Sequence, residues 1–285
     1  MYHRVLLTGA DGHLGRVLRL GLRGVWPVLR LTHRRPFGNP ETGEEILLAN
    51  LDVYDEVDAA MSGVDAVIHM GGRADEAAWK IIEQNNILGT YHVFEAARRH
   101  GVKRVVYASS NHVIGHYRRD RILTGTEPPR PDSLYGVSKV FGEALGRMYA
   151  DKYGLSVLSL RIGTCCETPL NRRALSTWLS FRDLVQLVRI CIDALDVHYE
   201  TVWGVSANTR GWWDNQAAER LGYRPQDNAE DYAAQAIEAE RRPREADQPQ
   251  SGLRPGSQPE PDAARLFQGG DFCAAGFAGD LDKID

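Results

Sequence analysis

The 285-residue chain is 43% hydrophobic and 25% charged, which is enough apolar material for one sizeable core. Its formal net charge of -4 gives no basic field of the kind that nucleic-acid binding needs, so no nucleic-acid partner is expected. The four cysteines lack the spacing of a zinc site or a disulfide framework, and no stretch reaches the roughly 18 apolar residues of a membrane span, so we expect a cytoplasmic protein that binds no metal and no membrane.

The chain alternates short apolar segments with helical patterns. Strands are expected at 5–10, 26–31, 45–51, 65–72 and 102–110, and again at 155–163 and 201–207. Such alternation is typical of βαβ units around a parallel sheet. We therefore predict an α/β fold, a doubly wound parallel sheet of the Rossmann type, with a small C-terminal substrate-binding part.

Two long helices are expected between these strands. The first spans 79–100 and ends before a glycine. The apolar residues on its buried face are Ile82, Ile87, Tyr91, Phe94 and Ala97. The second helix spans 133–153, and Gly154 ends it.

The composition divides the chain into three parts. Residues 1–240 are expected to form a single domain, with the substrate-binding elements mainly in 163–240. Residues 241–262 are rich in Pro, Gln and Glu and nearly free of apolar side chains, so we interpret them as a flexible linker. The tail, 263–285, contains the apolar segment RLFQGGDF and is expected to dock on the fold or on a neighbouring subunit.

The segment TGADGHLG places three glycines in a GxxGxxG pattern between the first strand and the first helix. Glycines at this junction allow a tight turn, close approach of the backbone to a pyrophosphate, and close helix packing, and the helix N-terminus attracts the phosphates. The pattern at this position predicts a dinucleotide site. The residues expected to contact the cofactor are Gly9, Gly12, His13, Leu14, Gly15, His33, Arg34, Asp52, Val53, Met70, Gly71, Gly72, Asn86, Tyr135 and Lys139.

Individual positions in this set have distinct expected roles. Asp52 follows the third strand, where its carboxylate accepts from the adenine amino group, and Val53 flanks the ring. Gly71 and Gly72 end the fourth strand beneath the cofactor. Asn86 is expected to orient the catalytic helix through a backbone contact.

The end of the second strand leaves the choice between NAD and NADP open. An acidic residue usually binds the adenosine ribose there, but this chain has His33, Arg34 and Arg35. These side chains either pair with a 2′-phosphate or form a solvated basic loop that does not contact the cofactor.

The segment SLYGVSK places Tyr135 and Lys139 four residues apart, on one face of a helix. Ser110 ends the preceding strand. A tyrosine with a pKa near 10 is a poor base at neutral pH, but a neighbouring lysine lowers that pKa. We predict that Tyr135 removes a proton from a substrate hydroxyl, that Ser110 binds the reacting oxygen, and that Lys139 also holds the nicotinamide ribose.

Longer segments carry a family resemblance. ASSNHVIGHY at 108–117, RPDSLYGVSK at 130–139, LRIGTC at 160–165, NRRALSTWLS at 171–180, WGVSANTRGWWDN at 203–215 and FQGGDF at 267–272 resemble the uronate dehydrogenases, a family of extended short-chain dehydrogenases. The resemblance implies oxidation of cyclic galacturonate or glucuronate at C1 with NAD, giving an aldarolactone. It further implies a sugar-acid site formed by Ala74, Ser110, Asn111, His112, Thr164 and Arg173.

Two positions depart from the pattern of that family. His33 stands where the resemblance implies a ribose-binding Asp, and Ala74 stands where it implies a Ser that contacts the substrate. A homo-oligomer is also expected, since such folds commonly pair through their long helices. Two alternatives stay open: a nucleotide-sugar epimerase or dehydratase of the same fold, which returns its hydride, and a non-catalytic dinucleotide sensor.

Overall fold

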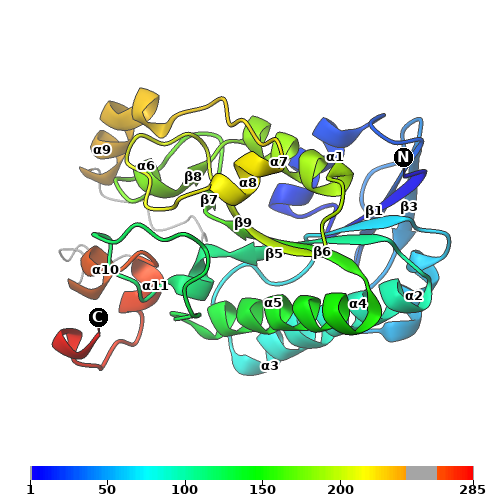
Figure 1. Ribbon diagram of the computed structural model, residues 1–285, viewed down its shortest axis with the longest axis horizontal. Helices are drawn as coiled ribbons and strands as arrows, with labels where there is room; N and C mark the ends of the chain where they lie inside the picture. Colours follow the sequence, from blue (N-terminus) through cyan, green and yellow to red (C-terminus); the bar gives the residue numbers. More distant parts are fainter. Residues whose placement is uncertain (1, 242–261, 285) are drawn as a thin grey trace.

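The computed structural model describes residues 2–241 and 262–284, and its centre is a seven-stranded parallel sheet (Figure 1). The strand order is β3-β2-β1-β4-β5-β6-β9, the arrangement of a Rossmann fold, so the predicted fold class is confirmed. The strands are β1 Arg4–Thr8, β2 Val28–His33, β3 Glu44–Leu48, β4 Ala66–His69, β5 Arg104–Ser110, β6 Ser156–Ile162 and β9 Tyr199–Gly204.

Helices cover both faces of this sheet, as Figure 1 shows. Helices α1 (His13–Leu22) and α7 (Phe181–Asp193) pack on one face, and α2 (Tyr54–Met61), α4 (Gly89–Arg99) and α5 (Leu134–Tyr153) pack on the other. Each layer buries its own hydrophobic cluster against the sheet, with Leu18 in one and Phe94 in the other. The central strands are therefore apolar on both faces.

The ends of α5 follow directly from the sequence. The Ser133 hydroxyl accepts the N–H of Gly136 (3.0 Å), which caps the N-terminus. Gly154 adopts a left-handed φ of 71° and ends the helix. Both ends agree with the prediction, and they fix where the first turn of α5, with Tyr135, begins.

The helix predicted at 79–100 contains an unexpected segment. It is built from α3 (Trp79–Ile82), a π-helical stretch η1 (Glu83–Leu88) and α4. A π-helical turn holds an extra residue, so it disturbs the regular spacing of buried positions near it. Phe94 and Ala97 are buried as predicted, but Tyr91 is 43% exposed, and the neighbouring His92 is buried instead. The prediction for Tyr91 was wrong because it assumed a constant helical period.

The C-terminal part lies over the ends of β5 and β6 (Figure 1). It contains β7 (Thr164–Cys165), α6 (Ala174–Thr177), β8 (Trp178–Leu179), α8 (Gln216–Arg220) and α9 (Ala233–Arg241), and the final helices are α10 (Asp262–Leu266) and α11 (Asp271–Ala274). Short turns of helix are η2 Asn111–Ile114, η3 Ala229–Tyr232 and η4 Leu281–Lys283. Except for its two end residues, the predicted linker 241–262 lies outside the described residues. Within the described ranges, no helix is both long and apolar enough to cross a membrane.

A buried ion pair ties α5 to the sheet. Glu143 accepts two hydrogen bonds from Arg161 on β6 (3.0 and 2.9 Å), and both side chains are at most 8% exposed. Removing one partner of such a pair leaves a buried charge without its counter-charge. We expect Glu143→Gln to lower the free energy of unfolding by about 3 kcal/mol, measured by urea denaturation.

The matched control lies one turn further along the same helix. Arg147 and Asp151 form an exposed i,i+4 pair (2.7 Å), so Arg147→Gln is expected to leave the stability unchanged within error. Equal midpoints for the Glu143→Gln variant and the wild type would refute the importance of the buried pair.

Candidate active site

The three predicted catalytic residues meet where β5 ends and α5 begins. Ser110 is the last residue of β5, and Tyr135 and Lys139 lie on the first two turns of α5. All three are at least 94% buried, at 4%, 6% and 6% exposure. The Lys139 ammonium donates to the Ala108 carbonyl (2.8 Å) and lies 5.6 Å from the centre of the Tyr135 ring. The sheet and the helix thus place an amine beside a phenol.

Burial changes the pKa of both groups. Desolvation raises the pKa of Tyr135 to about 12, although a hydrogen bond with Ser110 opposes the increase. Desolvation lowers the pKa of Lys139 to about 8. Lys139 can therefore lose its charge in mildly alkaline solution, whereas Tyr135 needs additional positive charge nearby to act as a base near neutral pH.

The glycine loop fits a dinucleotide sterically. Gly9 has a φ of +67°, and a Cβ atom there would lie 2.8 Å from the Gly71 Cα. A Cβ atom on Gly15 would lie 2.1 Å from the Gly9 carbonyl oxygen. These contacts allow only glycine, because the loop, α1 and the end of β4 approach one another closely. His13 and Leu14 form the first turn of α1, directly after Gly12.

The adenine side of the predicted cofactor site contains an orphaned acceptor. One carboxylate oxygen of Asp52, Oδ1, is buried and has no hydrogen-bond partner in the described part of the chain. Val53, which precedes α2, is 41% exposed, as a residue that packs on a ligand can be. A buried acceptor without a partner is costly, and an adenine amino group would satisfy it. The residues present therefore fit a dinucleotide.

Asn86 contacts the catalytic helix, but not in the predicted way. Its amide donates to the Ser138 side chain on α5 (2.9 Å), and it exchanges hydrogen bonds with the main chain of Arg73 (2.7 and 3.0 Å). The contact of Asn86 with the Arg73 main chain thus holds the segment that follows Met70, Gly71 and Gly72. Its contact with α5 is made through the Ser138 side chain. The expectation of a backbone contact to the helix was wrong because Ser138 carries a hydroxyl at this point.

Arg173 lies at the centre of the predicted substrate residues. It donates to the Thr164 hydroxyl (3.3 Å), and the Asn111 amide, oriented to satisfy both of its neighbours, accepts from Arg173 (2.7 Å) and donates to the Ile162 carbonyl (3.1 Å). Burial is the main cause that lowers the pKa of Arg173, and the nearby Arg119 also lowers it. Arginine still remains charged. The structure thus brings Asn111, Thr164 and Arg173 together.

The C-terminal segment forms another wall of the same site. The Gln268 carbonyl accepts from the Arg173 Nε (2.7 Å), and the Phe272 ring stacks on His112 with centroids 3.8 Å apart. The Nδ1 of His112 donates to the buried carboxylate of Asp132 (2.7 Å). Gln268 and Asp132 were missed by sequence reasoning; the FQGGDF and RPDS segments that contain them were the available signal.

Three predicted residues lie at the margin of this cluster. Ala74 is exposed on the loop after β4, and the next residues on that loop cap α5, since Glu76 accepts the Tyr135 N–H (2.8 Å). His13 is exposed, and its Nε2 lies 3.3 Å from the Cys165 carbonyl. His33 is partly buried at the end of β2. Their roles stay predictions.

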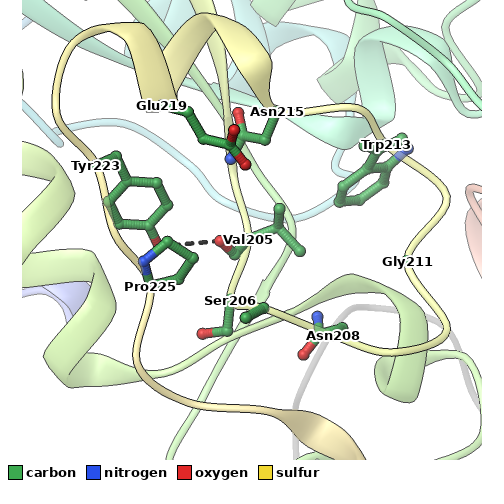
Figure 2. Close-up of a pocket in the computed structure, with 10 residues that line it drawn as sticks. Val205, Ser206, Asn208, Gly211, Trp213, Asn215, Glu219, Tyr223 and Pro225 are labelled. Carbon is green, nitrogen blue, oxygen red and sulfur yellow. Dashed lines mark hydrogen bonds between the residues drawn. The ribbon is translucent and has the colours of Figure 1, made fainter.

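A separate cavity of about 180 Å³ lies in the C-terminal part (Figure 2). It is lined by Val205, Ser206, Ala207, Asn208, Gly211, Trp213, Asn215, Glu219, Tyr223 and Pro225, none of which is a predicted site residue. The Asn215 side chain accepts a hydrogen bond from the Trp203 N–H (3.1 Å) and donates one to the Trp203 carbonyl (2.9 Å). The Tyr223 hydroxyl donates to the Val205 carbonyl (2.9 Å). These groups are already satisfied, so the cavity offers no reactive group comparable to Tyr135. Over the described residues, no His, Cys, Asp and Glu cluster could hold a metal ion.

Known proteins match this chain over most of its length. The model of the NAD dependent epimerase/dehydratase family matches residues 5–167. The uronate dehydrogenase of Pseudomonas putida is 44% identical over 277 residues, which cover 96% of this chain and 97% of that protein. The NAD-dependent glucose-6-phosphate dehydrogenase of Haloferax volcanii is 41% identical over 250 residues, 80% of this chain and 95% of that protein.

A solved structure gives the same picture in three dimensions. A mutant of the uronate dehydrogenase from Agrobacterium tumefaciens, complexed with NAD, matches with a TM-score of 0.85 and 41% identity, over 95% of this chain and 97% of that chain. The similarity therefore extends beyond the dinucleotide-binding half.

Proposed function

This chain belongs to the NAD dependent epimerase/dehydratase family, and from that membership we propose that it is a dehydrogenase that oxidises a cyclic hexuronate at C1 with NAD. The uronate dehydrogenases it resembles over nearly its whole length support this assignment. D-galacturonate and D-glucuronate are the proposed substrates, and the aldarolactone is the proposed product.

The main support for the substrate class is the environment of the Arg173 guanidinium. The Arg173 side chain is half-buried, and no carboxylate of the described residues forms an ion pair with it, although Asp132 and Asp271 lie near enough to favour its charge. Its hydrogen-bond partners are all neutral: the Gln268 carbonyl, the Thr164 hydroxyl and the Asn111 amide. A partly desolvated cation without a directly paired carboxylate is unfavourable. The carboxylate of a hexuronate would supply that charge through a bidentate pair.

The proposed reaction uses the catalytic set as a proton acceptor. With the substrate carboxylate on Arg173, the C1 hydroxyl lies between Ser110 and Tyr135, and the Tyr135 phenolate takes the hydroxyl proton. Ser110 donates to the same oxygen. NAD, when bound, accepts the hydride that leaves C1. Lys139 stabilises the phenolate by its charge, and the C1–O bond becomes the carbonyl of the lactone.

We expect kcat/KM to rise about tenfold per pH unit up to about pH 8 and then to level off. Below the pKa of Tyr135 the phenolate fraction rises about tenfold per pH unit, so the rate increases with pH. Above about pH 8 the buried Lys139 loses its proton and no longer stabilises the phenolate, so this loss offsets the further rise in the phenolate fraction. Initial rates between pH 6 and 10 measure the rise and the plateau. A flat profile from pH 6 to 8 would contradict a tyrosine base.

The test of function is a comparison of sugars with the purified chain. NADH formation is followed by absorbance with galacturonate, glucuronate, galactose, glucose 6-phosphate and L-arabinose, and NMR identifies the product. Net NADH with the two uronates, in equal amount to lactone or aldarate, supports the proposal. Turnover of the phosphate or the neutral sugars alone would refute the substrate class, and sugar conversion without net NADH would indicate an epimerase.

We also propose that the chain forms a homo-oligomer in the cytoplasm. Large apolar side chains are exposed along the neighbouring long helices, with Trp79, Ile81 and Tyr91 on the α3–α4 side and Val137 and Met148 on α5. Apolar surface of this kind is typical of an interface. The four cysteines are free thiols, which suits a reducing compartment. Light scattering after size exclusion measures the oligomeric state, and a monomer at micromolar concentration would refute the oligomer.

A further inference from the structure

We propose that the adenosine end of the cofactor site also accepts a 2′-phosphate, so that this chain binds NADP as well as NAD. The proposal concerns His33, Arg34 and Arg35 at the end of β2. It rests on the dinucleotide site of the proposed function but not on its sugar substrate.

The fold places these three residues beside the glycine loop. The Ala10 N–H, within that loop, donates to the carbonyl of Thr32 (3.0 Å), the residue that precedes His33. β1 and β2 run in register, with Thr8 opposite Thr32. In this fold the adenosine ribose of a bound dinucleotide lies at the end of the second strand, next to the glycine loop. Residues 33 to 35 therefore lie next to the position that the adenosine ribose would occupy.

The same region contains no acidic residue that could repel a phosphate. An Asp or Glu that binds the ribose hydroxyls selects NAD, because its charge excludes the 2′-phosphate. From His33, the last residue of β2, the sequence reads HRRPFGNP, and the first acid after this segment is Glu41. The acid of the glycine loop, Asp11, is paired with Arg16 (3.2 Å). The local charge is therefore positive where NAD enzymes usually have a carboxylate.

The two arginines are available for a ligand. Both Arg34 and Arg35 are exposed, and neither forms an ion pair with any residue of the ranges 2–241 and 262–284. By contrast, the nearby Arg19 is committed to Glu44 (2.7 Å) and Arg4 to Glu45 (3.0 Å). A guanidinium without a carboxylate partner can bind a phosphate with two parallel hydrogen bonds.

His33 is held in a fixed orientation that suits the same ligand. Its Nδ1 accepts the Arg35 N–H (3.3 Å) and lies 3.4 Å from the Arg35 carbonyl, while its ring packs edge-on against Phe37 with centroids 5.8 Å apart. Phe37 is itself buried, and the Arg19 guanidinium covers its ring at 5.7 Å. When Nδ1 accepts in the neutral ring, Nε2 carries the proton. The ring thus offers a donor, which either a ribose hydroxyl or a phosphate oxygen can accept.

The test uses two ligands that differ only in the 2′-phosphate. Isothermal titration calorimetry of the full chain with 2′,5′-ADP and 5′-AMP reports the phosphate contact without any turnover, and titrations with NADP and NAD extend it to whole cofactors. We expect 2′,5′-ADP to bind at least about tenfold more tightly than 5′-AMP. Raising the salt concentration should reduce this preference, because exposed charges are screened.

Variants identify the residues that hold the phosphate. The double variant Arg34→Gln/Arg35→Gln should reduce the preference to about twofold or less, and His33→Asp should reverse it in favour of 5′-AMP. Arg189→Gln replaces an exposed arginine on α7, so it removes one positive charge far from the ribose and should leave the preference unchanged. Loss of the preference in that control as well would mean a general charge effect and would overturn the assignment.

The outcomes separate the two proposals. If the wild-type chain binds NAD and 5′-AMP but binds 2′,5′-ADP no better, the 2′-phosphate site is refuted and the proposed function stands. If it binds 2′,5′-ADP and NADP but oxidises no uronate, the phosphate site stands and the substrate assignment fails. Binding of neither dinucleotide would refute both.

Discussion

A Tyr135→Phe variant is expected to lose about a thousandfold in kcat while it binds NAD as tightly as the wild type. The substitution removes only the hydroxyl, so the buried ring keeps its contacts with His112 and Phe272. What is lost is the proton acceptor that the proposed mechanism assigns to the C1 hydroxyl. Rapid-quench rates and calorimetric titration with NAD measure the two quantities.

The matched control is Tyr107→Phe. Tyr107 is also buried, on β5, and its ring also lies close to the Lys139 ammonium, at 5.1 Å. If Tyr135 acts through its own hydroxyl, only the first variant loses activity. Comparable losses in both variants would instead point to a general disturbance around Lys139, and unchanged turnover by Tyr135→Phe would support a chain that senses dinucleotide without oxidising a sugar.

The sheet was predictable because its signals are local. Each strand is a short apolar run, and Ser133 and Gly154 bound α5 through capping interactions that involve only neighbouring residues. The π-helical stretch Glu83–Leu88 has no such local signal. Its position is tied to Asn86, which reaches Arg73 and Ser138, and contacts between distant residues are not visible in a helical period.

In the candidate site, too, some positions were predictable from local sequence signals and others were not. Glycine spacing and the Tyr135–Lys139 spacing were sufficient to propose the cofactor and catalytic positions, because both depend on one turn or one helix. Arg173 was indicated only by a family resemblance. Its partner Gln268 is 95 residues away, and no spacing rule connects them. The buried amide of Gln268 donates to the Arg118 and Arg121 carbonyls (3.0 and 2.9 Å), so a tertiary contact positions the arginine.

The Arg173→Met variant should lose about a hundredfold in kcat/KM for galacturonate but little for galactose, which has no carboxylate. In the proposed complex the half-buried guanidinium pairs with the substrate carboxylate, and this interaction is worth more than an exposed ion pair because the site is partly shielded from water. Methionine retains much of the side-chain volume, so the packing of the stem against Gly270 is largely kept. The ratio of the two substrates is therefore the informative quantity, measured as initial rates of NADH formation.

Arg172→Met provides the control, because that neighbour is 56% exposed and pairs with Glu240 at the surface (3.1 Å). Arg173→Lys keeps the charge but loses the planar fork, so it should fall between the wild type and Arg173→Met. Gln268→Leu should shift the ratio in the same direction as Arg173→Met, by a smaller factor, since it leaves the guanidinium present but less firmly held. An equal loss for galacturonate and galactose would mean that Arg173 supports the fold rather than the carboxylate. A loss confined to galacturonate would assign the binding of the substrate carboxylate to Arg173.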